Sequence, residues 1–175
     1  MDRRLSGMIV TTRLVGASDA PWVLDLLVRA WHGPLIERTD EFIDASELPA
    51  ILAEIDGVPV GLVTLLVHAD HVEIMTLNSR REGIGVGSAL MAAAETFALE
   101  SGHTEVRLFA VNANLNALGF YQKRGYRFWA IHRDTITRAR ETKKPDIPVF
   151  AENSILIADE VELRKRLVRS EDLRS

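Results

Sequence analysis

The chain of 175 residues contains no cysteine. This absence excludes disulfide bridges, zinc–thiolate centres and a cysteine nucleophile. No window reaches the roughly 18 consecutive apolar residues of a membrane-spanning helix. The start of the chain also lacks the apolar segment of a secretory signal, and residues 1–8 are expected to form a disordered end. We therefore expect a cytoplasmic protein without a membrane partner.

Neither sign of charge dominates the sequence. The chain has 21 Lys and Arg against 25 Asp and Glu, and its formal net charge is −4. Without a clustered basic stripe, nucleic acid is not an expected partner. The five histidines are scattered. His68 and His71 lie close together, but neither an HExxH nor a carboxylate pattern is seen around them, so no metal is expected. The length fits one domain with a single hydrophobic core.

The N-terminal half predicts one helix followed by strands. A cap at Ser18 and Pro21 in the first turn predict a helix that runs to about Trp31. Residues 34–48 are acidic and poor in apolar side chains, which favours a loop with at most one short helix. Apolar and β-branched runs predict strands at 9–15, 50–55, 59–67 and 71–77, the last three forming an antiparallel meander whose first turn is Asp56-Gly57.

The second half alternates helices and strands. A glycine-rich turn leads into a helix that ends at Gly102, a residue type that commonly follows a helix. Asn114 is expected to cap a short helix that stops at Gly125. The remaining segments are predicted as strands at 104–111 and 126–132, a helix at 133–142 and a strand within 155–167, although the last also offers ion pairs at helical spacing.

The turn at residues 80–88, RREGIGVGS, lies between a strand and a helix. Glycines let the backbone N–H groups face inward, and the helix N-terminus adds about half a positive charge. The turn is therefore a candidate site for a phosphate or pyrophosphate. The alternative is a tight turn that binds nothing. A Walker loop is excluded because no lysine follows the glycines, and the spacing does not fit GxGxxG.

A second motif follows about thirty residues later. Residues 114–126 read NLNALGFYQKRGY. Together with Arg80-x-x-Gly83-x-Gly85, this stretch resembles the GNAT superfamily, the Gcn5-related N-acetyltransferases. The two motifs match that family's pyrophosphate loop and its Asn-x-x-Ala-x-x-x-Tyr-x-x-x-Gly-Phe/Tyr pattern, in order and in phase. The resemblance covers residues 9–132.

The resemblance implies an α/β (α+β) fold. It consists of a mixed, mostly antiparallel sheet of six to seven strands with helices on both faces. The fourth and fifth strands, at about 71–77 and 104–111, are expected to splay apart and admit the pantetheine arm of the coenzyme. Residues 9–132 would form the acyltransferase core, and residues 133–175 an extension that packs on the core or on a partner subunit.

The resemblance also implies acetyl-CoA as cosubstrate, with no metal. Backbone groups near Thr76 and Leu77 would hold the pantetheine arm and polarise the thioester carbonyl, and Arg80 or Arg81 would add a charged hydrogen bond to the pyrophosphate. The expected cofactor-binding residues are Thr76, Leu77, Arg80, Arg81, Gly83, Ile84, Gly85, Val86, Gly87, Ser88, Asn114 and Tyr121.

Tyr121 falls on the family's general-acid position. A phenol with a pKa of about 10 can protonate a thiolate of similar basicity. The alternative is a ring that only packs. Glu73 is the candidate base, against an ordinary exposed glutamate, and its alternation with Met75 and Leu77 predicts that all three side chains point to the same face. His71, Asp70 and a water chain are further candidates. Without cysteine, direct transfer in a ternary complex is favoured over an acyl-enzyme.

The acceptor is expected to be a primary amine on a small molecule or peptide. Trp31 and His32 are candidate substrate-binding residues beside an acidic segment that would attract a cation. A solvated loop anchored by one tryptophan is the favoured alternative for that segment. Phe128, Trp129 and residues 155–157 could line the site or form a homodimer contact. The other functional class that stays open is a catalytically inactive acyl-CoA-binding sensor or partner domain.

Overall fold

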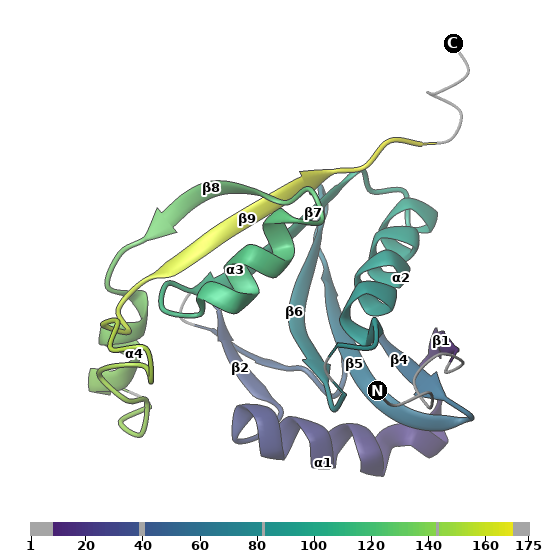
Figure 1. Ribbon diagram of the computed structural model, residues 1–175, viewed down its shortest axis with the longest axis horizontal. Coiled ribbons are helices and arrows are strands. Elements are labelled where there is room, and N and C mark those ends of the chain that lie inside the picture. The colour runs from purple at the N-terminus through teal and green to yellow at the C-terminus, as the bar shows by residue number, and fades with distance from the viewer. Residues whose placement is uncertain (1–8, 39–40, 82, 143, 170–175) are drawn as a thin grey trace, which may run out of the picture. The chain divides into compact units, whose positions relative to one another are not determined.

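The computed structural model describes residues 9–38, 41–81, 83–142 and 144–169 (Figure 1). The segment predicted to be a disordered end, residues 1–8, lies outside the described residues. The chain divides into unit 1, up to residue 104, and unit 2, from residue 105, and each is described by itself. Among the helices of the described residues, none is long and apolar enough to cross a membrane.

Unit 1 contains an antiparallel sheet in the order β1-β4-β5-β6. The predicted hairpin at Asp56-Gly57 is confirmed, and both residues have positive φ, 51° and 75°, as a type I′ hairpin turn requires. The elements are β1 (Val10–Leu14), a 3₁₀ turn (Ala17–Asp19), α1 (Ala20–Trp31), β2 (Leu35–Arg38), β3 (Glu41–Asp44), β4 (Ala50–Ile55), β5 (Val58–Val67), β6 (Val72–Ser79) and α2 (Val86–Glu100).

The first helix begins one residue later than its predicted cap implies. Ser18 lies inside the 3₁₀ turn, and Asp19 is the N-cap of α1. The Asp19 carboxylate accepts hydrogen bonds from Arg13 at 2.6 Å and from the Gly16 N–H at 2.8 Å. These bonds, first the one from Arg13, lower the pKa of Asp19 to about 2. Arg13 also pairs with Glu54, so β1, β4 and the start of α1 are joined by one guanidinium.

The prediction of a loop over residues 34–48 is wrong. Strands β2 and β3 form a separate antiparallel pair in which Ile36 stands opposite Ile43. Ile36 and Ala45 are buried in the cluster formed with α1, and Ile43 packs against it. The acidic composition conceals this pair because its strand character comes from tertiary burial of a few apolar side chains.

The two helices of unit 1 cover opposite faces of its sheet. Leu52 and Leu62 stand opposite each other on β4 and β5 and are buried with Leu26 and Leu27 of α1. Gly61, the neighbour of Leu62, faces the other way, since successive strand residues point to opposite faces. A Cβ on Gly61 would lie 2.6 Å from Val86 Cγ1 of α2. This glycine therefore sets how closely α2 approaches β5.

The end of α2 confirms the role predicted for Gly102. Its φ is 86°, and its N–H donates to the Leu99 carbonyl at 3.0 Å. The His103 N–H donates to the Ala98 carbonyl at 2.8 Å. The two bonds complete a Schellman motif, which satisfies carbonyls at the end of the helix.

Unit 2 contains an antiparallel sheet in the order β7-β9-β8. The predicted strand in the tail is confirmed, and β9 is hydrogen-bonded to both other strands (Figure 1, yellow). The division of the chain into a 9–132 core and a 133–175 extension stays a prediction. The elements are β7 (Glu105–Val111), α3 (Leu115–Gln122), β8 (Arg127–His132), α4 (Thr135–Thr142) and β9 (Glu160–Arg166).

Polar side chains hold the segment between α4 and β9 in place. Asn112 donates to the Leu156 carbonyl at 2.8 Å and accepts from the N–H groups of Ala158 and Asp159, each at 3.1 Å. The Arg140 guanidinium donates to the Ile147 carbonyl at 2.9 Å. Because backbone carbonyls of this segment are satisfied by side chains, it can keep a defined course without regular secondary structure.

The contact at Gly61 predicts a loss of stability when a methyl group is added there. The Cβ of Gly61→Ala would lie 2.6 Å from Val86 Cγ1 of α2 and 2.9 Å from the Asn78 carbonyl oxygen of β6, so β5 must shift against both elements. We expect the free energy of unfolding in urea to fall by about 1–3 kcal/mol. The control is Gly119→Ala in α3, where an added Cβ meets nothing within 4 Å, and where alanine is expected to stabilise the helix by about 0.5–1 kcal/mol. Equal stabilities of wild type and Gly61→Ala would contradict the packing argument.

Candidate functional site

The glycine-rich turn has the geometry of an anion-binding helix N-terminus. Gly83 and Gly85 have positive φ, 77° and 88°, and Gly85 is the N-cap of α2. The Ala89 N–H donates to the Gly85 carbonyl at 2.9 Å. Gly85 has no side chain that could accept a capping hydrogen bond, and a Cβ at either glycine would meet nothing within 4 Å. The first amides of α2, from Val86 to Ser88, therefore begin beside open space, where a helix carries partial positive charge.

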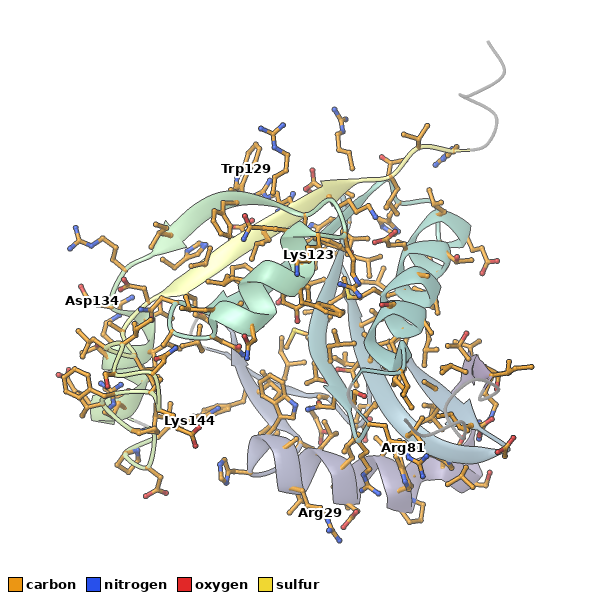
Figure 2. All side chains as sticks on the ribbon, viewed as in Figure 1. Arg29, Arg81, Lys123, Trp129, Asp134 and Lys144 are labelled. Atoms are coloured by element: carbon orange, nitrogen blue, oxygen red, sulfur yellow. The ribbon has the colours of Figure 1, made fainter. Side chains whose placement is uncertain are left out.

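The two arginines of the turn have different surroundings. Arg80 donates to Asp25 Oδ2 at 2.8 Å, and its guanidinium lies 4.9 Å from the centre of the Trp22 ring. Hydrogen bonds from Arg29 and from Arg80 lower the pKa of Asp25. Arg81, labelled in Figure 2, is exposed, and its backbone carbonyl accepts from Ser79 Oγ at 2.6 Å. Arg80 thus joins the turn to α1. Both arginines are exposed, so either could contact a ligand from solvent.

A β-bulge changes the faces predicted for β6. The register between β5 and β6 shifts, so that Glu73 stands opposite Leu66 and Thr76 stands opposite Thr64. Leu66 and Thr64 are two residues apart and share a face, which places Glu73 and Thr76 on one face although they are three residues apart. The prediction that Leu77 shares the face of Glu73 is therefore wrong, because Leu77 lies beyond the bulge.

Thr76 and Leu77, expected near the thioester, follow the bulge directly. The Thr76 hydroxyl is 2.8 Å from that of Thr64, and Thr76 is buried. Leu77 is half-buried and stands opposite Val63. The two side chains therefore pack within the sheet, so only backbone groups of this segment are candidates for contact with a coenzyme.

Glu73 lies in a group of four titratable side chains. It is only 5% exposed, which contradicts the alternative of an ordinary exposed glutamate. Its Oε2 is 3.2 Å from His68 Nε2. The ring of His68 stacks on that of His71, with centroids 4.2 Å apart, and His71 Nδ1 is 2.7 Å from Asp70 Oδ1. The sequence reading missed that both histidines have carboxylate neighbours; the spacing His-x-x-His-x-Glu was the signal.

Asn114 caps α3 as predicted. Its Oδ1 accepts from the Ala117 N–H at 3.1 Å, and the residue is exposed. It also borders a cavity of about 720 Å³ in unit 2. Of residues 155–157, which the sequence offered as a possible lining of the acceptor site, Ile157 borders this cavity, and the other tail residues around it were not predicted. The cavity is lined by Val111, Ala113, Asn114, Leu115, Asn116, Ile136, Ile147, Ala151, Glu152, Asn153 and Ile157.

Tyr121 lies in the last turn of α3, packed edge-on against two aromatic rings. The centroid of its ring is 5.3 Å from that of Phe120 and 6.2 Å from that of Tyr126. Burial raises the pKa of Tyr121 to about 12. Its hydroxyl has no hydrogen-bond partner among the residues that the structure describes. The side chain is thus a protonated phenol at neutral pH, held by its ring.

The candidate acceptor residues lie at the end of α1. Trp31 Nε1 donates to Asn78 Oδ1 at 2.7 Å, which joins the last turn of α1 to β6. His32 is exposed and has a left-handed backbone, with φ 60°, at the C-cap. Asn78 is thus the residue to which Trp31 anchors the end of α1, the alternative role considered for this tryptophan. A role of Trp31 and His32 in acceptor binding stays a prediction.

Aromatic side chains project from β8, the outer strand of the unit 2 sheet. Phe128 and Trp129 are 55% and 64% exposed. Figure 2 shows Trp129 pointing away from the strand, and the Arg164 guanidinium lies 4.2 Å from the centre of its ring. Neither residue lines the cavity beside Asn114. That Phe128 and Trp129 form a wall of the acceptor site or a homodimer contact stays a prediction.

Comparison with known proteins places these features in a family. Residues 21–126, more than half of the chain, match the model of the acetyltransferase (GNAT) family. The uncharacterized protein YdhI of Bacillus subtilis strain 168 is 35% identical over 138 residues, which cover 78% of this chain and 86% of YdhI.

Solved structures share the fold. An IAA acetyltransferase from Bacillus cereus has a TM-score of 0.71 at 23% identity, and the match covers 91% of this chain and all of that one. A Bacillus subtilis acetyltransferase in complex with CoA has a TM-score of 0.65 at 19% identity, covering 93% of this chain and all of that one. These likenesses confirm the predicted fold class.

Proposed function

We propose that this chain, which belongs to the acetyltransferase (GNAT) family, transfers the acetyl group of acetyl-CoA to a primary amine by direct attack in a ternary complex. The observation that carries the proposal is the start of α2. Gly83 and Gly85 turn the backbone into left-handed conformations, and the N-cap of α2 is a glycine, which has no side chain to accept a capping hydrogen bond. Such a terminus suits a diphosphate because its amides donate hydrogen bonds to the anion.

The residues proposed to hold the coenzyme extend from the turn to α3. Amides between Gly83 and Ser88 would bind the pyrophosphate, and Arg80 or Arg81 would add a charged hydrogen bond. Backbone groups after the β6 bulge, at Thr76 and Leu77, would contact the pantetheine arm. Asn114 would add a side-chain hydrogen bond while it caps its own helix.

The proposed chemistry needs one proton donor and one proton acceptor. The amine nitrogen forms a bond to the thioester carbonyl carbon, the C–S bond breaks, and the thiolate leaves. Tyr121 would give its proton to that sulfur, since its hydroxyl is protonated at neutral pH. Glu73, buried and hydrogen-bonded to His68, would accept the proton lost by the amine.

The acceptor is proposed to carry a primary amine on a small molecule or peptide. Trp31 and His32 stay the candidate contacts, because the end of α1 places an aromatic ring and an exposed imidazole beside each other in sequence. We propose that the protein acts in the cytoplasm and binds neither nucleic acid nor a membrane. A homodimer is a further proposal for its assembly.

Free-thiol release from acetyl-CoA with a panel of primary amines tests the function. We expect thiol release that depends on at least one amine of the panel. Tight coenzyme binding without release from any amine would instead favour an acyl-CoA-binding sensor, and absence of coenzyme binding would reject both functions.

Removing the phenol hydroxyl tests the proposed acid. Tyr121→Phe keeps the ring contacts to Phe120 and Tyr126, so coenzyme affinity is expected to stay unchanged. We expect kcat to fall by about 10²- to 10⁴-fold. The matched control is Tyr126→Phe, which changes the other tyrosine of the chain and is expected to keep kcat. Wild-type turnover by Tyr121→Phe would remove Tyr121 from the mechanism.

The raised pKa of Tyr121 predicts the alkaline side of the pH–rate profile. Since the pKa is raised to about 12, the hydroxyl keeps its proton well above the pH at which an ordinary phenol, with a pKa of about 10, loses it. We expect kcat, measured with saturating substrates, to show no decline from Tyr121 ionisation below about pH 11. A decline with an apparent pKa near 10 that is absent in Tyr121→Phe would contradict the raised pKa of Tyr121, although it would support the role of Tyr121 as the acid.

A further inference from the structure

Two imidazoles and a carboxylate meet at the turn between β5 and β6. One ligand atom from each of His68, His71 and Glu73 lies within 4.8 Å of the other two. His71 and Glu73 are buried, at 7% and 5% exposure, and His68 is half-buried. All three belong to unit 1, so the cluster is defined within a single unit.

We propose that His68, His71 and Glu73 bind a divalent transition-metal ion of the zinc class. Two imidazole nitrogens and one carboxylate oxygen form a donor set used by zinc sites that keep a fourth position open. Imidazole ligands favour Zn²⁺, Co²⁺ and Ni²⁺, whereas Mg²⁺ and Ca²⁺ prefer oxygen ligands. The donor set therefore selects the class of ion.

The distances in the cluster are close to those that such an ion requires. Bonds of about 2.0–2.1 Å in a tetrahedral site place ligand atoms roughly 3.3 Å apart. His68 Nε2 and Glu73 Oε2 are already 3.2 Å apart. All three ligand atoms lie within 4.8 Å of one another. Each of the other two pairs of ligand atoms would therefore have to approach by at most about 1.5 Å to reach the tetrahedral separation. The rings of His68 and His71 are stacked nearly parallel, with 9° between their planes, so the half-buried His68 ring must turn out of this stack for both in-plane lone pairs to reach one ion. The ion would then replace the proton that joins His68 to Glu73.

Asp70 supplies the outer hydrogen bond that metal-binding histidines usually have. Its Oδ1 is 2.7 Å from His71 Nδ1. A carboxylate oxygen only accepts, so Nδ1 carries the proton and the lone pair of the neutral ring lies on Nε2. A carboxylate in this position orients the ring and increases its basicity as a ligand.

The backbone of the turn holds the two histidines in place. The His68 N–H donates to the His71 carbonyl at 2.9 Å, directly beyond the Val67 and Val72 pair of the two strands. His103 Nε2, from the segment after α2, is 3.0 Å from the His68 carbonyl oxygen. Ligands on a short, hydrogen-bonded turn lose little freedom when an ion binds, which favours binding.

Metal binding would oppose the proposed acetyl transfer. An ion on Glu73 and His68 would occupy the carboxylate that is proposed to accept the amine proton. The metal site does not rest on that function, however, because binding is measured on the chain alone, without coenzyme or acceptor. The two proposals can therefore fail separately.

Titration with Co²⁺ tests the site on the full-length chain, treated with chelator and free of any polyhistidine tag. We expect one Co²⁺ per chain, with the visible absorption of a tetrahedral site that Zn²⁺ displaces. His68→Gln, His71→Gln and Glu73→Gln should each abolish that absorption. Asp70→Asn keeps all three ligands and should weaken binding by about tenfold, the lower end of outer-shell effects, because Asp70 is exposed.

His132→Gln is the matched control. His132 Nε2 is 2.9 Å from Glu162 Oε2 in unit 2, a histidine–carboxylate pair outside the cluster. This variant should bind Co²⁺ as the wild type does, and thermal melts without metal should show that each variant is folded. Equal binding by wild type and the three ligand variants would overturn the proposal, as would loss of binding in His132→Gln alone.

Discussion

The close approach of α2 to β5 determines where the first turn of α2 presents its amides. Gly61 makes this approach possible, because any Cβ there would collide with Val86, the first residue of the helix. The turn before α2 then needs left-handed backbone at Gly83 and Gly85. The packing of α2 on β5 and the left-handed conformations of the turn thus involve the same few residues. The proposed diphosphate site follows from the way in which α2 packs on its sheet.

The other proposed residues are positioned by equally local means. The Tyr121 hydroxyl is held by a ring that packs against Phe120 and Tyr126, and burial keeps it protonated. Glu73 is buried beside His68 on a strand whose bulge separates it from Leu77. Each group is therefore oriented before any ligand arrives, which is the condition for efficient proton transfer.

Features that depend on neighbours in sequence were predictable. The Asp56-Gly57 hairpin, the Gly102 helix end and the Asn114 cap were all predicted because each follows from the chemistry of a few adjacent residues. The two family motifs likewise identified the fold.

Features that depend on contacts between residues distant in sequence were missed. Strands β2 and β3 form through burial of Ile36 against α1, and the β6 bulge is visible only in its register with β5.

The account is tested most directly by the affinity of the chain for coenzyme A and for pantetheine, which lacks the diphosphate together with the 3′-phosphoadenosine, by isothermal titration calorimetry. Two charge-assisted hydrogen bonds of about 1.5 kcal/mol each correspond to roughly 100-fold in affinity. We therefore predict that coenzyme A binds on the order of 100-fold more tightly than pantetheine. Equal affinities would show that the amides of α2 do not bind the diphosphate and would contradict the account.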